Sequence, residues 1–472
     1  MIISAPYPGC ASLTLAENFD AFSMHIKQRI IEWFGYLDEP VSGASLAVFR
    51  ICFSTSMLAL VYEYFHLNWI DSLSGQRSCH FAFVEGISAL PGSGMHILLA
   101  CLALLAALMG VGFLYRFSAL LFFLVYSYIF LVEESLYQNH MYLIALLGFL
   151  MFIVPAQRVW SVDGLRKNFS ETVPKWCVLI LKLQFVVVYF YGGIAKLNLD
   201  WFSGHPLTEF LLLRASDPFF GPLFGHLFRA HWFVTFITYG GIAVDLSIGF
   251  LLLYRRTFWL GASIALLFHL TNSCMFNIDV FPWLMIASIG LFAPEDWPYS
   301  VLKFFKIKLP QQRQAGQSNQ KTHVRMIILI HVYIAVQLLV PIRRVFYPGD
   351  PCWTEQAHQF AWRMLLREKS SSGFEMTVVD PRNGTVGLVH PEYTLSAEQM
   401  KDMIVVPHLM LHFAHFVAND FEQQVGIRPK VFVRAKVSLN GRPAQYIVDP
   451  SVDLAAQPDS LLPANWIMPL KR

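Results

Sequence analysis

Charged residues are scarce in this sequence, and their scarcity decides its class. Asp, Glu, Lys and Arg make up 14% of the 472 residues, whereas hydrophobic residues make up 55% and aromatic residues 15%. A soluble domain carries about 25% charged residues. A water-soluble core cannot bury this much apolar surface, but a lipid bilayer can cover it. The composition therefore predicts a polytopic integral membrane protein.

Other features are missing as well. The net charge is only +3, and no Lys/Arg cluster interleaved with aromatic residues suggests a nucleic-acid surface. The seven cysteines show no CxxC pair and no Cys/His zinc spacing. Most of them lie in or near apolar runs, so we expect buried, inert thiols. The first forty residues contain no apolar signal-peptide core, so we expect no cleavable signal peptide.

Apolar stretches long enough to span a bilayer, or nearly so, recur along the first three quarters of the chain. They predict about nine transmembrane helices, at residues 44–62, 96–114, 117–133, 140–155, 176–195, 233–253, 258–276, 279–293 and 326–341. The fold class is therefore mainly α: a transmembrane helix bundle over residues 44–345, preceded by a segment of residues 1–43 and followed by a small α+β extramembrane domain over residues 346–472.

The distribution of basic residues predicts the orientation. Lys27 and Arg29 precede the first span, and alternate connections carry most of the remaining basic residues: Arg116, Arg158, Arg166, Lys167, Lys175, Arg255, Arg256, Lys303, Lys306, Lys308, Arg313 and Lys321. The positive-inside rule places these connections and the N-terminus in the cytoplasm. Nine crossings then place the C-terminal domain in a lumen or periplasm. Arg343 and Arg344 are exceptions to the rule, and the polar segment 310–321 is predicted to be a cytoplasmic loop.

The C-terminal domain has the pattern of strands and turns. Asn383-Gly384 and Asn440-Gly441 are pairs that supply the positive φ of tight hairpin turns. They predict two hairpins, one of residues 374–379 with 385–389 and one of residues 431–437 with 445–448. Between the hairpins, Ser396 and Gln399 form a capping box at the start of a predicted helix to about residue 424. We expect Pro407 to kink this helix.

Ionisable residues within the apolar spans are functional candidates, because a charge in the bilayer costs about 3 kcal/mol or more. Five places stand out: His140 preceded by Asn139, Lys182, Lys196, Asp245, and His269 with Asn272. Each also has a structural interpretation. Lys182 and Lys196 lie near helix ends, where a lysine extends to the interface. Asp245 can anchor a neighbouring helix through hydrogen bonds, and either histidine can be a buried core residue.

Three of these candidates fall near the outer ends of their helices in the predicted topology. Lys196 follows Gly192 and Gly193, which allow a ligand or another backbone to approach closely. A lysine in a dehydrated site can lose its proton near neutral pH and act as a base. Histidine and asparagine side chains beside it can bind a polar head group. The pattern indicates acid–base chemistry on a lipid-soluble substrate, without identifying that substrate.

Several short motifs resemble those of the vitamin K-dependent γ-glutamyl carboxylases. They are collinear and spread over residues 44–470: Ala44-Ser-Leu-Ala-Val-Phe-Arg50, Asn139-His-x-Tyr-Leu143, Trp160-Ser-Val-Asp-Gly-Leu165, Lys196-Leu-x-x-Asp-Trp201, Asp245-Leu-Ser-x-Gly-Phe-Leu-Leu252, His269-x-x-Asn-Ser273, Phe276-x-Ile278, Trp297-Pro298, Asp380-Pro-Arg-x-Gly384, Asp449-Pro-x-Val-Asp453 and Trp466-x-x-Pro-Leu470.

The resemblance implies an enzyme that uses vitamin K hydroquinone, O2 and CO2, with no metal. The residue matching Lys196 takes a proton from the hydroquinone, and oxygenation then yields a base strong enough for the γ-carbon of a glutamate. CO2 adds to that carbon, and the vitamin leaves as its epoxide. Catalytic roles fall on Lys196 and His140, with His140 in the carboxylation half-reaction. Cofactor-binding positions are Asn139, His269, Asn272, Tyr189, Met285 and Trp362. The partners implied are a glutamate-containing protein or peptide and the bilayer.

Two departures from the animal enzymes keep alternatives open. The chain lacks their further lumenal region, and Cys79 matches one end of a family disulfide although no cysteine follows Cys352. A quinol epoxidase without glutamate carboxylation is therefore a second hypothesis. A membrane transporter is the third, but the sequence shows neither inverted repeats nor matching pairs of broken helices.

Overall fold

The computed structural model describes residues 11–67, 79–84, 86–167, 170–276, 278–307 and 324–471. Three features of the sequence fall outside these ranges: Cys10, Arg77 and most of the basic connection that includes the segment 310–321.

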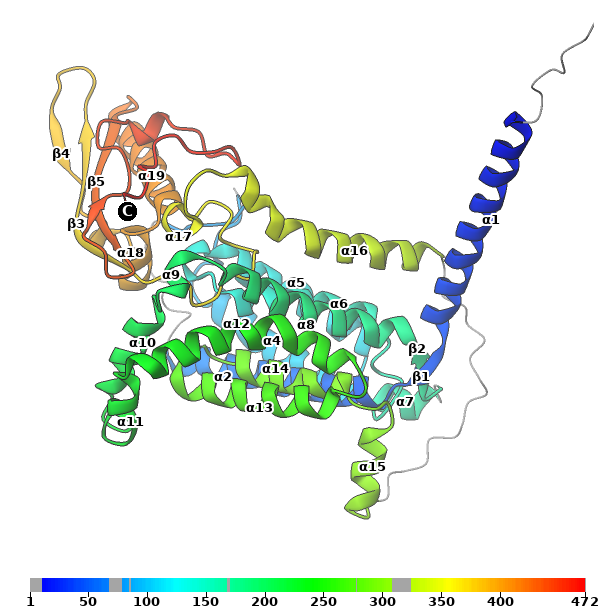
Figure 1. Cartoon of the computed structure of the whole chain (residues 1–472). Helices are drawn as coiled ribbons and strands as arrows, with labels where there is room; N and C mark the ends of the chain where they lie inside the picture. Colours follow the sequence, from blue (N-terminus) through cyan, green and yellow to red (C-terminus); the bar gives the residue numbers. More distant parts are fainter. Residues whose placement is uncertain are drawn as a thin grey trace, which may run out of the picture.

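All nine predicted apolar segments are helices. They are α2 (Ala44–His66), α4 (Gly94–Val111), α5 (Tyr115–Val132), α6 (Asn139–Ile153), α8 (Lys175–Ala195), α12 (His231–Leu253), α13 (Phe258–Met275), α14 (Phe281–Phe292) and α16 (Val324–Ile342). Within the described ranges, seven are long and apolar enough to cross a membrane, while α6 and α14 are apolar but shorter. The protein is therefore a mainly helical, multi-pass membrane protein (Figure 1).

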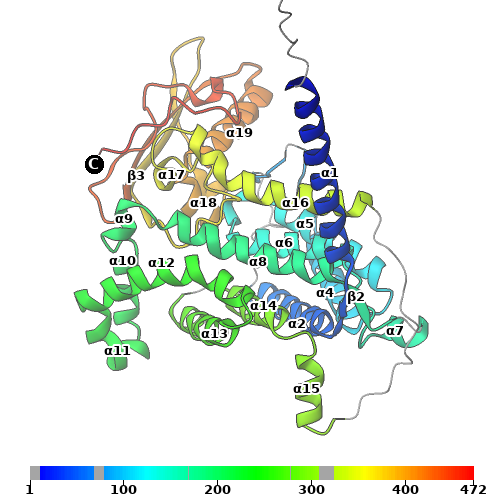
Figure 2. The ribbon, with the colours of Figure 1, turned by 45° about the vertical axis from the view of Figure 1, so that its right-hand side comes forward.

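The structure also contains helices that the sequence analysis did not predict. The longest is α1 (Ala11–Asp38), which projects away from the bundle in both views (Figures 1 and 2). The others are short: η1 (Glu134–Leu136), α7 (Val162–Lys167), α9 (Leu199–Phe202), α10 (Leu207–Ala215), α11 (Phe220–Phe228), α15 (Trp297–Phe304), η2 (Arg343–Phe346), α17 (Pro351–Thr354), η3 (Pro391–Tyr393) and η4 (Leu454–Ala456). A two-stranded antiparallel ribbon of β1 (Pro40–Ser42) and β2 (Thr172–Pro174) joins the start of α2 to the start of α8.

Two of the family-like motifs, at residues 44–50 and 160–165, form hydrogen bonds that hold helices of the bundle together. Arg50 is fully buried, and its guanidinium donates hydrogen bonds to the carbonyl oxygens of Gly110, Ala156 and Trp160 at 3.1, 2.6 and 2.6 Å, and to one further carbonyl. The Asp163 carboxylate accepts hydrogen bonds from the first backbone N–H groups of α5. These bonds satisfy a buried charge and a helix start, so the motifs around residues 44–50 and 160–165 stabilise the fold.

Beyond α16 the chain forms a four-stranded antiparallel sheet in the order β4-β3-β5-β6. The strands are β3 (Lys369–Val379), β4 (Val386–Leu388), β5 (Lys430–Leu439) and β6 (Gln445–Tyr446). Both predicted hairpins are confirmed. Gly384, Asn440 and Gly441 adopt φ values of 69°, 51° and 74°, the left-handed conformations that these turns require.

The prediction of one kinked helix from Ser396 to residue 424 is wrong. The segment forms two helices, α18 (Ala397–Met403) and α19 (Pro407–Val425). The capping box of Ser396 and Gln399 is present at the start of α18. Pro407 starts α19 instead of kinking a longer helix, because its missing N–H and fixed φ suit the first turn of a helix.

The sheet, α18 and α19 lie at one end of the bundle (Figure 1). An apolar core shared by both parts includes Ala195, Trp201 and Ile242 from the bundle side and Trp353 and Leu409 from the C-terminal part. Polar contacts add to it: Asp200, after α8, accepts hydrogen bonds from Asn440 and Arg442, both at 2.8 Å. The C-terminal part is therefore packed firmly on the helix ends.

Candidate active site

A cavity of about 920 Å³ lies between the bundle and the C-terminal part. Its walls come from the ends of the helices, from the loop between α17 and β3, and from residues 457–467 near the C-terminus. Seven of the eight predicted site residues line it: Asn139, His140, Tyr189, Lys196, His269, Asn272 and Met285. These residues come from α6, α8, α13 and α14, with Lys196 directly after α8, so only the tertiary structure brings them together.

Lys196 and Asp245 form a buried ion pair on the cavity wall. Lys196 Nζ lies 2.6 Å from Asp245 Oδ2, and the two side chains are 8% and 6% exposed. The same Nζ donates a hydrogen bond to Gly192 O at 3.3 Å and lies 5.1 Å from the centre of the Trp201 ring. The lysine is therefore turned into the protein and does not extend to the surface.

Glycine at position 193 permits this ion pair. A Cβ atom there would lie 2.6 Å from the Leu246 side chain and 3.1 Å from the Leu246 backbone nitrogen. Since real Cβ atoms do not approach other atoms so closely, any larger residue would push α8 and α12 apart. The close approach of the two helices places Asp245 beside Lys196, which follows the end of α8.

A second polar pair lies deeper along α8. The Tyr189 hydroxyl and His269 Nε2 are 2.7 Å apart and buried, and Tyr189 precedes Lys196 by two helical turns. The other ring nitrogen of the histidine, Nδ1, is buried and makes no hydrogen bond to any residue that the structure describes. A buried polar atom without a partner is a candidate for contact with a ligand or an ordered water.

Asn139 and His140 start α6 and have different surroundings. The Asn139 amide donates to Arg363 O at 3.2 Å and accepts from the Tyr137 hydroxyl at 3.3 Å, so the residue holds the neighbouring loop. His140 Nε2 lies 3.2 Å from Asp279 Oδ2, at ion-pair distance but without hydrogen-bond geometry. Asp279 lies between α13 and α14, and no local sequence pattern links it to His140.

The loop after α17 forms one wall of the cavity and has an unusual backbone. Five residues that are not glycine adopt positive φ: Glu355, Ala357, Phe360, Trp362 and Leu365. Such conformations cost about 1–3 kcal/mol each and persist where the surroundings enforce them. Glu355 supplies one anchor, because its carboxylate pairs with Lys369 at 2.6 Å and Arg367 at 3.1 Å. Burial alone would raise the pKa of Glu355, but these two cations lower it below its usual value.

The remaining candidates are placed at different depths. Met285 is fully buried in the cavity wall, and Asn272 is half-buried there. Trp362, the eighth predicted residue, does not line the cavity. Its ring is fully buried and stacks on Tyr142 with ring centres 5.0 Å apart. Lys182 is also outside the cavity, with its Nζ 5.9 Å from the centre of the Phe292 ring.

Three arginines, Arg343, Arg363 and Arg367, line the cavity, and so do the carboxylates of Glu134, Glu355, Asp402 and Asp459. Arg367 is neutralised by Glu355, and Arg343 donates to the Gln359 carbonyl at 2.6 Å. Arg363 is buried, donates to Cys352 Sγ at 3.2 Å and leaves its Nε without a partner. Two positive side chains thus face the cavity without a paired carboxylate in the described part of the chain, as an acidic substrate would require.

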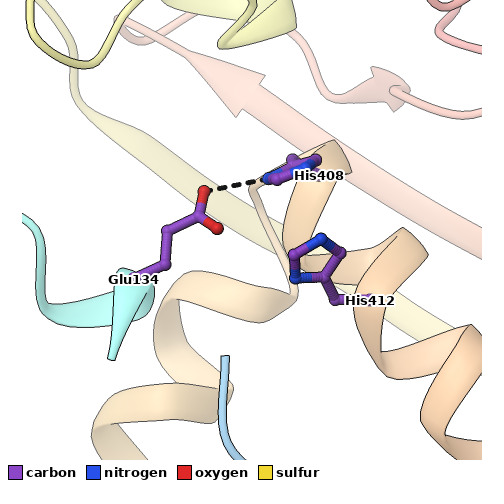
Figure 3. A group of neighbouring side chains, drawn as sticks. All are labelled: Glu134, His408 and His412. Atoms are coloured by element: carbon purple, nitrogen blue, oxygen red, sulfur yellow. Dashed lines mark hydrogen bonds and ion pairs between the residues drawn. The ribbon is translucent and has the colours of Figure 1, made fainter. Parts of the chain in front are cut away.

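One group in the described part of the chain has the composition of a metal site. Ligand atoms of Glu134, His408 and His412 lie within 4.8 Å of one another (Figure 3). The group lies apart from the Lys196 ion pair, although Glu134 and His408 also line the cavity.

Comparison with known protein families gives two matches that together cover most of the chain. Residues 38–297, more than half of the chain, match the HTTM domain. Residues 321–472 match the lumenal domain of vitamin K-dependent gamma-carboxylase. The chain belongs to the vitamin K-dependent carboxylase family. No solved structure matches it.

Membership of the carboxylase family supports a carboxylase-like function that involves vitamin K, and it identifies the C-terminal part as a lumenal-type domain. The family disulfide is absent as such: Cys79 and Cys352 are both buried free thiols. Sequence reasoning missed the Lys196–Asp245 pair, the contact of Asp279 with His140, and the strained loop. The two pairs join residues far apart in the chain, and the loop uses positive φ at residues that are not glycine, so none of the three has a local sequence signal.

Proposed function

We propose that this protein oxygenates vitamin K hydroquinone to the epoxide and couples this reaction to addition of CO2 at the γ-carbon of protein glutamate. The observation that carries the proposal is the buried Lys196–Asp245 ion pair, which opens on a large cavity lined by the other candidate residues. Family membership supports vitamin K as the co-substrate.

The ion pair is suited to accept the hydroquinone proton. One proton is shared between the Lys196 amine and the Asp245 carboxylate, as ammonium with carboxylate or as amine with carboxylic acid. In a poorly hydrated site the population of the neutral amine–carboxylic acid form increases, because the two charges of the ionic form lose their solvation. The pair then takes one further proton from a hydroquinone hydroxyl, leaving an ammonium beside a carboxylic acid. Lys196 contacts the hydroquinone hydroxyl. Asp245 holds the second proton of the pair and positions the lysine.

Oxidation of the hydroquinone by O2 supplies the basicity that no side chain of the protein possesses. Hydroquinone and O2 yield the epoxide and water, while a glutamyl γ-C–H and CO2 yield a new C–C bond and a released proton. The protein has to hold the head group, exclude water and manage protons. Tyr189, His269 and Asn272 lie where a head group entering from the bilayer would meet polar atoms.

The acidic substrate enters from the other side in this proposal. Arg343 and Arg363 provide positive charge on the lumenal wall and favour a glutamate-containing peptide. His140, backed by Asp279, is placed to handle the proton released during carboxylation. The alternation of basic connections in the sequence supports a cytoplasmic N-terminus and an outer, lumenal or periplasmic C-terminal domain.

Purified protein incubated with vitamin K hydroquinone, O2, labelled bicarbonate and a short glutamate peptide tests the proposal. Epoxide and fixed label are measured separately. Both products are expected, in comparable amounts. Epoxide without label would establish the quinol epoxidase instead, and neither product would refute the proposed function.

A further inference from the structure

A cluster of two histidines and two carboxylates lies where the helix bundle meets the C-terminal domain. His408 and His412 are four residues apart on α19, so both rings project from the same face of the helix (Figure 3). Glu134 begins η1, directly after α5, and Asp459 comes from the segment before the C-terminus. Three segments distant in sequence therefore converge on one point.

The distances within the cluster are short. His408 Nδ1 lies 2.9 Å from Glu134 Oε1, and His408 Nε2 lies 3.1 Å from Asp459 Oδ1. His412 Nε2 lies 2.9 Å from Asp459 Oδ2, and the two imidazole rings are 4.2 Å apart between centres. Ligands of a tetrahedral zinc ion lie about 3.3 Å apart, given zinc–nitrogen bonds of about 2.0 Å. Ligand atoms of Glu134, His408 and His412 lie within 4.8 Å of one another, whereas Asp459 contacts His408 through the ring nitrogen opposite to the one that faces Glu134.

Groups around the cluster orient its members, as they do around bound metal ions. Gln359 Nε2 donates to Glu134 Oε1 at 2.9 Å and fixes the carboxylate. His415, one turn along α19, contacts Gln457 O through its Nε2 at 2.8 Å and holds the segment that carries Asp459. Hydrogen bonds of this kind orient ligands and tune their affinity for a metal.

We propose that Glu134, His408 and His412 bind one zinc ion that joins the helix bundle to the C-terminal domain, and that the Asp459 carboxylate orients both imidazoles. Two imidazoles and one carboxylate are ligands that zinc takes in proteins, with a water in the fourth position, and because they come from both parts of the chain the ion would join those parts. The resemblance to the carboxylases implied no metal, and this proposal departs from that expectation.

The position of the site gives the ion an indirect effect on catalysis. Glu134 lies five residues before Asn139 and six before His140, on the connection that leads into α6. Fixing this connection fixes the start of α6 and so the position of both residues in the cavity. The zinc ligands are positioning residues, and none of them contacts the Lys196–Asp245 pair.

Metal content of the purified full-length protein tests the proposal without any turnover. After loading with zinc and dialysis against a weak chelator, about one zinc per chain is expected, and cobalt should give the intense visible absorption of a tetrahedral site. His412→Ala should lose the retained metal. His390→Ala removes an exposed histidine of the same domain that pairs with Glu392, so it is the matched control and should keep the metal.

A ligand exchange keeps the test valid where an alanine variant fails to fold. His412→Cys supplies a thiolate in the same place, so it should retain cobalt and add a near-ultraviolet thiolate-to-cobalt absorption band. Wild-type protein that retains no zinc and shows no cobalt spectrum would overturn the proposal and leave an ion-pair contact only. Equal metal content in wild type and His412→Ala would also overturn it. Neither result bears on epoxidation by the Lys196 pair, which is measured separately.

Discussion

The substitution Asp245→Asn tests whether the ion pair works as one proton-accepting unit. Asparagine keeps the shape of the side chain but removes the negative charge that lies 2.6 Å from Lys196 Nζ. Breaking a buried ion pair by removing one partner costs about 3–5 kcal/mol, because a charge is left uncompensated. In the variant no carboxylate can take up a proton when the pair accepts one from the hydroquinone, so we assign most of that cost to the proton transfer.

A difference of about 3 kcal/mol corresponds to roughly 100-fold in rate. We therefore expect Asp245→Asn to lower epoxide formation by about two orders of magnitude or more. The assay is chromatography of vitamin K epoxide from purified protein, with a thermal melt to show that the variant is folded. Asp279→Asn is the matched control: it removes the carboxylate beside His140, so it should reduce carboxylation and largely spare epoxidation. Epoxidation by Asp245→Asn within about threefold of wild type would refute the reasoning.

Three further predictions concern packing, docking and the second half-reaction. Gly193→Ala should lower the melting temperature and epoxidation together, since its Cβ would lie 2.6 Å from Leu246 and overpacking costs about 1–3 kcal/mol; normal stability would contradict this. Asp200→Asn should weaken docking of the C-terminal domain by about 2 kcal/mol, seen as faster proteolysis. Burial would raise the pKa of Asp200, but its hydrogen-bond partners, Arg442 first among them, lower it. The contribution of Asp200 to docking should therefore be complete above the usual carboxyl pKa and should vanish as the pH falls through the lowered pKa. His140→Ala should impair carboxylation more than epoxidation, and equal losses would argue against its assigned role.

Much of the fold could be predicted because bilayers and tight turns impose simple rules. Runs of apolar residues predicted all nine helices of the bundle, and Asn-Gly pairs predicted both hairpins. The site residues stood out because ionisable groups are rare in lipid, so Lys196 and His269 were recognisable without any structure.

The parts that could not be predicted depend on tertiary contacts. Nothing in the local sequence pairs Lys196 with Asp245, because the relative positions of α8 and α12 are set by packing around Gly193. The loop after α17 uses positive φ at residues that are not glycine, so its shape carries no local sequence signal. Pro407 was assigned a kink because a proline is compatible with either a helix interior or a helix start until the neighbouring contacts are known.

Chemical rescue of Lys196→Ala tests the central claim most directly. The variant should lose epoxide formation and carboxylation together, because the lysine accepts the proton that starts the reaction. Small amines of graded pKa, added to the purified variant, should restore epoxide formation in proportion to their basicity as far as they fit the space left by the side chain. If Lys196 only anchored the helix end, none of the amines would restore epoxide formation to the variant. Epoxide formation by Lys196→Ala near the wild-type rate would contradict the account, whatever the amines do.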